Sequence, residues 1–499
     1  MKPGITPLRI VTTVASGAII VVVISAAVVA LSHGGEHLST VTEADDVTKM
    51  KLPPLFPEIM LTHSVAGVHT RPSPSTTPLA TQPHVNPVQR TESTASTHTS
   101  PTPSTASMET MDTEPETEPV LLPQKPMTRF PVVCVFGTAT NESQPLPADG
   151  VCDFTFYDGM YGAGPFDTLY SPRFSAPVEH VLSHASLHTA TEYGLSFAYR
   201  KRAQVAQDIA MPSGLSMIEE LWDRRIRHYG FLSIENYDAD AFRESIRTMT
   251  QMQRHRDGKA SYLAIGLFIE RTEIKGALDT MRQIYTPDLI IAHGHVAYDD
   301  RKFGADCKMI FPTPFSADGR YRESQLSALA MLEDINYSTS ALAVSVALFA
   351  RRYKPAFPDP DTSSDVTGYS PGMQCTSYKG KHLISLTQFC TDRMYVRGHH
   401  PDVLYAGRAT SSKKRQRTIL YDNEFTLAEK LCLSKERHMG LSYGVAVYGL
   451  EYADHSHACP NLLTRAYART RLAKALVRYF ESRPSIDDVE NNCTYIRPE

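Results

Sequence analysis

Three carboxylates follow an apolar segment near the middle of the chain, where they could act as acids or bases. The run Arg227–Asp240 reads Arg-His-Tyr-Gly-Phe-Leu-Ser-Ile-Glu-Asn-Tyr-Asp-Ala-Asp, so Glu235, Asp238 and Asp240 come directly after the strand-like segment Phe231–Ile234. A positioned carboxyl group transfers protons well when its pKa lies near the working pH. Most carboxylates, however, lie on solvated loops. The sequence therefore leaves two interpretations open, a displaced catalytic acid and an ordinary surface loop.

Histidines at alternating positions offer a second kind of chemistry. His293 and His295 follow a strand-like segment, and His455 and His457 repeat the spacing nearer the C-terminus. Neutral imidazole is a common ligand of Zn²⁺, so these four residues could resemble a metal site. Histidines at a polar strand end more often form hydrogen bonds with their neighbours. We therefore predict no metal ion and no cofactor.

The elements that must position these residues alternate along the chain. Strand-like runs cover Val132–Phe136, Cys152–Tyr157, Gly194–Tyr199, Phe231–Ile234, Tyr262–Ile269, Asp288–Ala292, Ala341–Ala347 and Tyr443–Leu450. Helical periodicity covers Ser216–His228, Ala241–Gln253, Ile274–Ile284, Gln325–Asp334 and Leu427–His438. Because strands that alternate with helices form parallel sheets, these runs predict an α/β fold with a closed (β/α)8 barrel, a TIM barrel.

The N-terminal region predicts a membrane anchor. No charged residue occurs from Ile10 to Leu31, and about 20 apolar residues suffice to cross a bilayer. Lys2 and Arg9 precede this segment, which favours a cytoplasmic N-terminus and an extracellular C-terminal domain. A cleaved signal peptide is the alternative, although its apolar core usually has only about 7–15 residues. We expect a single-pass type II protein of the cell membrane.

Composition divides the chain further. We assign residues 1–9 to a cytoplasmic tail, 10–31 to the transmembrane signal-anchor helix, and 32–127 to a disordered stalk rich in Ser, Thr and Pro. Residues 128–484 form the predicted globular ectodomain, and 485–499 a C-terminal tail.

All eight cysteines follow the stalk, which predicts disulfides in an oxidising compartment. Asn141, Asn336 and Asn492 begin glycosylation sequons. The net charge of −4 gives no reason to predict a nucleic-acid partner.

Several segments, in the right order, resemble glycoside hydrolase family 18, the chitinases and chitinase-like lectins. Phe130–Cys134 and Leu146–Asp153 resemble the family's opening. Ala341–Tyr353 resembles its strand-seven segment, with Arg351 at the family's arginine. Leu441–Cys459 resembles its closing section, with Tyr448 at the sugar-platform tryptophan and Glu451 at the aspartate.

This resemblance implies further features of the fold. It implies a small α+β insertion between barrel strands seven and eight. It also pairs Cys134 with Cys152 and Cys390 with Cys459. The other cysteines, Cys307, Cys375, Cys432 and Cys493, receive no partner from it.

The family's strand-four motif is the part that this chain lacks. Active members carry Asp-Gly-x-Asp-x-Asp-x-Glu, in which the Glu protonates the glycosidic oxygen and the neighbouring Asp orients the substrate's acetamido group. Here Arg227–Phe231 matches the lead-in, but Ala239 occupies the acid position in one register and Asn236 in a register anchored on Tyr237. Neither register supplies the Glu. The resemblance therefore implies a divergent member without a catalytic residue and without chitinase activity.

Three functions remain open for such a domain. The first is binding of glycans, chitin or N-acetylglucosamine oligomers, in the old cleft. The second is a protein-binding or signalling ectodomain with a vestigial cleft, and the third is a glycosidase with a displaced acid. Aromatic residues along an open groove favour the first, because they stack on sugars; a groove filled by its own side chains favours the second. The candidate ligand-binding residues are Tyr199, Glu235, Tyr237, His293, His295, Arg351, Tyr448 and Glu451.

Overall fold

The computed structural model describes most of the C-terminal part of the chain. The described residues are 127–296 except 163, 165 and 257, then 307–316, 323–335, 339–354, 356, 372–376, 383–390, 396–400, 407–412, 417–456 and 466–498. The predicted anchor (10–31), the stalk up to residue 126, Asn336, His457 and Cys459 lie outside them. Among the helices of the described residues, none is long and apolar enough to cross a membrane.

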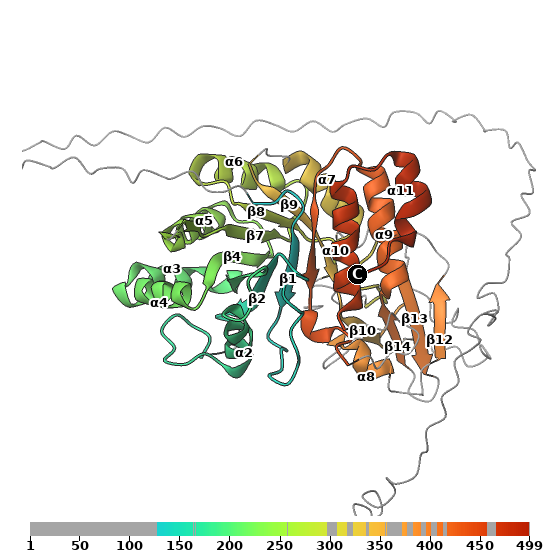
Figure 1. Cartoon of the computed structure of the whole chain (residues 1–499), viewed down its shortest axis with the longest axis horizontal. Coiled ribbons are helices and arrows are strands. Elements are labelled where there is room, and N and C mark those ends of the chain that lie inside the picture. The colour runs from blue at the N-terminus through green and yellow to red at the C-terminus, as the bar shows by residue number, and fades with distance from the viewer. Residues whose placement is uncertain are drawn as a thin grey trace, which may run out of the picture. The chain divides into compact units, whose positions relative to one another are not determined.

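Parallel strands form a closed barrel at the centre of this region (Figure 1). Their order around the barrel is β1-β15-β9-β8-β7-β4-β3-β2, which confirms the predicted barrel of eight strands. The bounds are β1 Val132–Phe136, β2 Phe154–Met160, β3 Glu192–Phe197, β4 Ile226–Ile234, β7 Leu263–Leu267, β8 Leu289–Ala292, β9 Ala341–Ala347 and β15 Gly444–Tyr448. The barrel closes where β1 pairs with β15, with Val132 opposite Val445.

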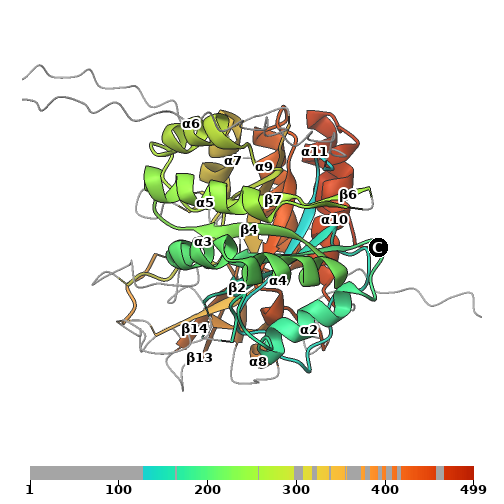
Figure 2. The same ribbon diagram turned by 90° about the vertical axis from the view of Figure 1, so that its left-hand side faces the viewer.

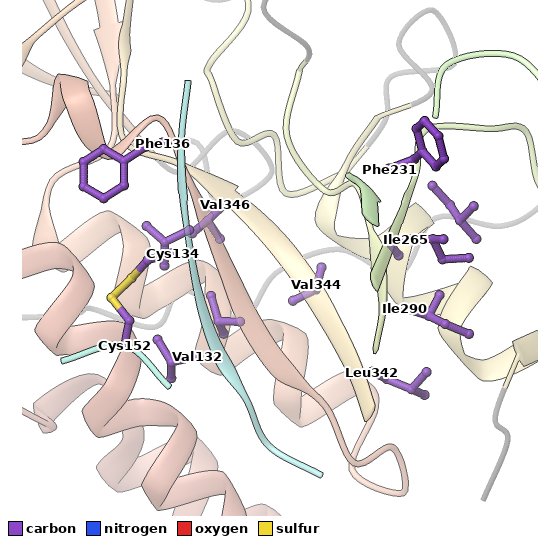
Figure 3. Close-up of a cluster of buried hydrophobic side chains, with 14 of the residues drawn as sticks. Val132, Cys134, Phe136, Cys152, Phe231, Ile265, Ile290, Leu342, Val344 and Val346 are labelled. Atoms are coloured by element: carbon purple, nitrogen blue, oxygen red, sulfur yellow. A yellow bond between two sulfur atoms is a disulfide. The ribbon is translucent and has the colours of Figure 1, made fainter. Parts of the chain in front are cut away.

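Both faces of the barrel strands are buried, as expected for a parallel sheet covered by helices. Inward-facing side chains form one cluster that includes Val133, Phe156, Leu232 and Ile291. Outward-facing side chains form the larger cluster against the helices. Figure 3 shows part of it, with Val132, Cys134 and Phe136 along β1 and Leu342, Val344 and Val346 along β9. This alternation determines which residues at the strand ends point into the barrel mouth.

Helices cover the outside of the barrel (Figure 2). They are α2 Ala176–Ala185, α3 Arg202–Ala210, α4 Pro212–Asp223, α5 Ala239–Met252, α6 Ile274–Ile284, α7 Gln325–Ile335, α9 Glu424–Arg437 and α10 Ala468–Glu481. A short hairpin of β5 (His255–Arg256) and β6 (Lys259–Ala260) precedes β7. The predicted bounds of α6 and β9 agree with the structure.

One predicted helix is too long. The periodicity predicts a helix over Ser216–His228, but α4 ends at Asp223 and β4 begins at Ile226. Arg225 breaks the helix, because its φ of 66° is left-handed. Its guanidinium donates to the carbonyl oxygens of Ser186 and His188, so a tertiary contact fixes this turn. Such a contact leaves no trace in local periodicity.

The predicted insertion between β9 and β15 is present. It contains a sheet in the order β11-β10-β14-β13-β12 (lower right in Figure 1), whose pairs are antiparallel. The bounds are β10 Ala350–Tyr353, β11 Leu383–Ile384, β12 Val396–His400, β13 Gly407–Ser412 and β14 Arg417–Tyr421, with α8 Leu386–Cys390 between β11 and β12.

Disulfides connect distant parts of this fold. The predicted Cys134–Cys152 bond is present, with the two Cα atoms 5.9 Å apart. Cys307 pairs with Cys375, and Cys432 with Cys493. Cys390 is disulfide-bonded, but its predicted partner Cys459 lies outside the described residues.

Residues 485–499, assigned to a tail from the sequence, contain helix α11 (Ile486–Asn492). The Cys432–Cys493 disulfide attaches this segment to α9. The sequon residues Asn141 and Asn492 are exposed.

Candidate functional site

Three barrel strands bring a carboxylate and two serines together at the barrel mouth. Asp158 alternates with Phe154 and Phe156 on β2 and therefore points inward. Its carboxylate accepts hydrogen bonds from the hydroxyls of Ser196 (2.7 Å) and Ser233 (2.8 Å). Burial, which disfavours the charged form, raises the pKa of the Asp158 carboxyl. Sequence reasoning missed this residue, although the period-two pattern of β2 could have located it.

Tyr448 lies beneath the mouth and does not offer a sugar platform. Its ring is fully buried, and its hydroxyl donates to the carbonyl oxygen of Leu232 at 2.8 Å. A stacking platform must present an exposed face, and Tyr448 presents none. The tyrosine fills the barrel axis, and its direct contact with a ligand stays a prediction.

The predicted histidine pair packs against Tyr448. The rings of His293 and His295 are stacked with centroids 5.0 Å apart, and both rings contact Tyr448. His293 Nε2 donates to Leu232 O at 2.8 Å, and His295 Nδ1 lies 2.6 Å from the hydroxyl oxygen of Ser345. Burial lowers the pKa of His293 to about 4, so its ring is neutral near pH 7. Together with Tyr448, the two histidine rings fill the centre of the barrel.

The β4–α5 junction contains the two residues that the alternative registers of the strand-four motif place at the acid position. Ala239 is the first residue of α5 and does not line the cleft beside the barrel mouth. Asn236 has a left-handed φ of 86° and lines a cleft beside the mouth. The register anchored on Tyr237, which places Asn236 at the acid position, therefore agrees better with the structure. The adjacent Glu235 is half-buried and close enough to raise the pKa of Asp158.

The remaining candidates lie in different surroundings. Half-buried Tyr199 packs on Phe231, and Tyr237 packs on Phe242 outside the barrel. Arg351 is 1% exposed and donates to the hydroxyl of Tyr353 at 2.7 Å. Arg351 and Tyr237 thus contribute to packing, and their role as ligand contacts stays a prediction.

An open cleft lies beside the filled axis. Its volume is about 1050 Å³, and it borders the carboxyl ends of β7 and β8, the β7–α6 loop and α7. Its walls include Asn236, Phe268, Glu273, His293 and Met331. The combination of an aromatic ring with amide, imidazole and carboxylate groups resembles a small-molecule site. The ring of Phe268, half-buried and T-shaped against His293, is the aromatic face of this cleft. Of the predicted candidates, His293 is a cleft residue.

The described members of the predicted histidine set form hydrogen bonds with protein groups. In the described part of the chain, no group of three or more His, Cys, Asp or Glu side chains is placed to hold a metal ion. His455 Nδ1 lies near the carbonyl oxygen of Ala453, and His457 is outside the described residues.

Glu451 is the second carboxyl near the mouth, and it is 8% exposed. Burial raises its pKa to about 7, although the amide of Gly137 donates to Oε2 at 3.0 Å. The folded protein therefore binds this proton more tightly than the unfolded chain does. The stability that this proton gives is complete below pH ~4.5 and is lost as the pH rises through about 7.

Glu451→Gln should consequently stabilise the protein at alkaline pH. The amide keeps an acceptor for Gly137 but carries no charge, so we expect a gain of about 1–3 kcal/mol at pH 8 and a much smaller difference at pH 5. Urea unfolding of the wild type and the variant at pH 5 and pH 8 measures the free energy of unfolding. A variant that is less stable than wild type at pH 8 would contradict the assignment.

Known structures with a similar fold include chitinases and chitinase-like proteins. Human YKL-39, described as a pseudo-chitinase with retained chitooligosaccharide binding properties, has a TM-score of 0.51 at 9% identity, covering 69% of this chain and 98% of that chain. A class V chitinase mutant from Nicotiana tobaccum in complex with NAG4 has a TM-score of 0.50 at 9% identity, covering 69% and 99%. No family model matches the sequence, and no curated protein is similar to it.

The barrel therefore belongs to the (β/α)8 class, with an α+β insertion before its last strand. Within that class, this chain has a divergent chitinase-like fold.

Proposed function

We propose that this protein binds N-acetylglucosamine oligomers without hydrolysing them. The observation that carries the proposal is the cleft at the carboxyl ends of β7 and β8, with the amide of Asn236 in its wall. TIM barrels bind their ligands at this end of the strands. An amide can hydrogen-bond a sugar, but it cannot deliver a proton to a leaving oxygen.

Two features support a glycan as the ligand. Phe268 offers an aromatic ring for stacking on a sugar face, and the polar groups around it can bond hydroxyl and acetamido groups. YKL-39, whose fold is similar, is described as retaining chitooligosaccharide binding. The cleft volume of about 1050 Å³ can hold several sugar units.

The test of this proposal is Phe268→Ala. Removing the ring should weaken binding of N-acetylglucosamine tetramer at least about fivefold, because the ring supplies stacking worth about 1 kcal/mol or more. Isothermal titration calorimetry measures the dissociation constant. Phe166→Ala is the matched control, since Phe166 is 64% exposed and does not line the cleft. Equal affinity in both variants, or no binding by wild type, would refute the proposal.

A protein-binding ectodomain is the second candidate. Tyr448, His293 and His295 fill the barrel axis, so the central part of a chitinase-type cleft is closed by the protein's own side chains. A cleft that no longer binds sugar is expected to be closed by side chains in this way. Absence of oligosaccharide binding by the wild-type protein would favour this second function.

A further inference from the structure

We infer that His180 and His184 bind a transition metal ion, Zn²⁺ or a divalent ion of similar preference, on the outer surface of the barrel. Both histidines lie on α2, one helical turn apart, so they share one face of the helix. In Figure 2, α2 lies at the lower right, whereas α7, which borders the cleft, lies near the top. The site is independent of the proposed glycan cleft.

Hydrogen bonds fix the tautomer of each ring. His180 Nε2 lies 2.7 Å from the carbonyl oxygen of Gln144, and His184 Nδ1 lies 2.9 Å from the carbonyl oxygen of His180. A carbonyl oxygen only accepts, so both of these ring nitrogens must carry the hydrogen. In the neutral form of each ring, the opposite nitrogens, Nδ1 of His180 and Nε2 of His184, then hold lone pairs. Metal-binding histidines are usually held in this way, with the other ring nitrogen donating to a carbonyl or carboxylate.

The spacing of the rings suits a shared ion. Their centroids lie 5.0 Å apart with an interplanar angle of 71°. Two imidazoles at Zn–N distances of about 2.0–2.1 Å in tetrahedral geometry have centroids roughly 5 Å apart. Both side chains are half-buried, so they are partly ordered and still reachable from solvent.

A third histidine lies one turn further along. The ring of His188 is 6.2 Å from that of His184, and its Nδ1 is 2.8 Å from the hydroxyl oxygen of Tyr193. Arg225 holds the His188 carbonyl in place. This larger spacing makes His188 a neighbour of the site, and water completes the coordination of the two-histidine chelate.

The chemistry of the pair selects the ion. Two neutral imidazole nitrogens favour Zn²⁺, Ni²⁺ and Cu²⁺ over Mg²⁺ and Ca²⁺, which prefer oxygen ligands. A bound ion would join successive turns of α2 and, through His180, reinforce its contact with the Gln144 loop. Binding to the folded form alone would stabilise this side of the barrel.

The test compares matched histidine variants of the full-length protein, purified in mild detergent because residues 10–31 are predicted to cross a membrane. ZnCl₂ is titrated by calorimetry into wild type, His180→Gln, His184→Gln and His255→Gln. His255 is exposed on β5 and serves as the control. We expect about tenfold or greater loss of affinity in the first two variants and none in the control. Equal zinc binding in all four proteins, or no saturable binding by wild type, would overturn the inference.

A second measurement on wild-type protein locates the site without depending on how the variants fold. Diethyl pyrocarbonate acylates the unprotonated ring nitrogen of histidine, and mass spectrometry reads the modified peptides. Zn²⁺ should protect the peptide that contains residues 176–185 several-fold and leave the peptide with His255 unprotected. Acylation of His180 and His184 at the same rate with and without Zn²⁺ would reject the site.

Discussion

The purified full-length protein is expected to hydrolyse a chromogenic chito-oligosaccharide about 10²–10⁴ times more slowly than an active chitinase of similar fold. The physical reason is the neutral amide of Asn236 in the cleft wall, where a protonated carboxyl would be required. The carboxyl of Asp158 does not line the cleft, and its hydrogen bonds to Ser196 and Ser233 hold it in place. The initial rate of chromophore release at several pH values measures the difference.

Glu235 is a candidate for a displaced catalytic acid. It is half-buried next to Asn236 and lies near Asp158. If the protein turns over substrate within about a hundredfold of the active enzyme, Glu273→Gln in the cleft wall, Glu235→Gln and Asp158→Asn show which carboxyl supplies the proton. Turnover that any one of these substitutions abolishes would establish a displaced acid and contradict the non-catalytic proposal.

Lys430→Met should destabilise the barrel by about 3–5 kcal/mol. Lys430 Nζ donates to Asp422 Oδ1 and to the carbonyl oxygen of Thr313, each at 2.5 Å, and the side chains of the ion pair are at most 1% exposed. Methionine fills a similar volume but leaves the Asp422 carboxylate buried without its counter-ion. Chemical denaturation at pH 7 measures the free energy of unfolding.

Lys474→Met is the matched control. Lys474 pairs with Asp153 at 2.6 Å, but the two side chains are 16% and 31% exposed, so solvent screens the pair and the expected cost is below about 1 kcal/mol. The double variant Lys430→Met/Asp422→Leu removes both buried charges and should recover part of the lost stability. An equal loss of stability in Lys430→Met and Lys474→Met would show that burial does not determine how much these ion pairs contribute to the free energy of unfolding.

The fold was predictable because its signals are local. Most barrel strands contain a short apolar run, and α6 and β9 end at the residues that the sequence pattern predicts. The α4–β4 boundary was not predictable, since it depends on Arg225 bonding to carbonyls far away in the sequence. The pairing of Cys432 with Cys493 likewise follows from the packing of α11 on α9.

The candidate site was harder to predict than the fold. Sequence identified the segment that lacks the acid, but it could not decide between Ala239 and Asn236, because that choice depends on where β4 ends and α5 begins. Tyr448 carries an aromatic ring at the expected position, yet burial removes it from solvent. The cleft at Phe268 arises from the spacing between the β7–α6 loop and α7, which residue types do not encode.

The pairing of β1 with β15 has a consequence for biosynthesis. These strands come from opposite ends of the described chain, so β1 cannot find its second neighbour until Gly444 and the residues after it have been made. At about 5–20 residues per second, roughly 15–60 s separate the synthesis of the two strands. During that interval the growing sheet exposes an unpaired edge, which is prone to aggregation. A premature stop codon before residue 444 would leave this edge permanently open, so such truncated products should depend on chaperones and be degraded rather than accumulate as smaller folded proteins.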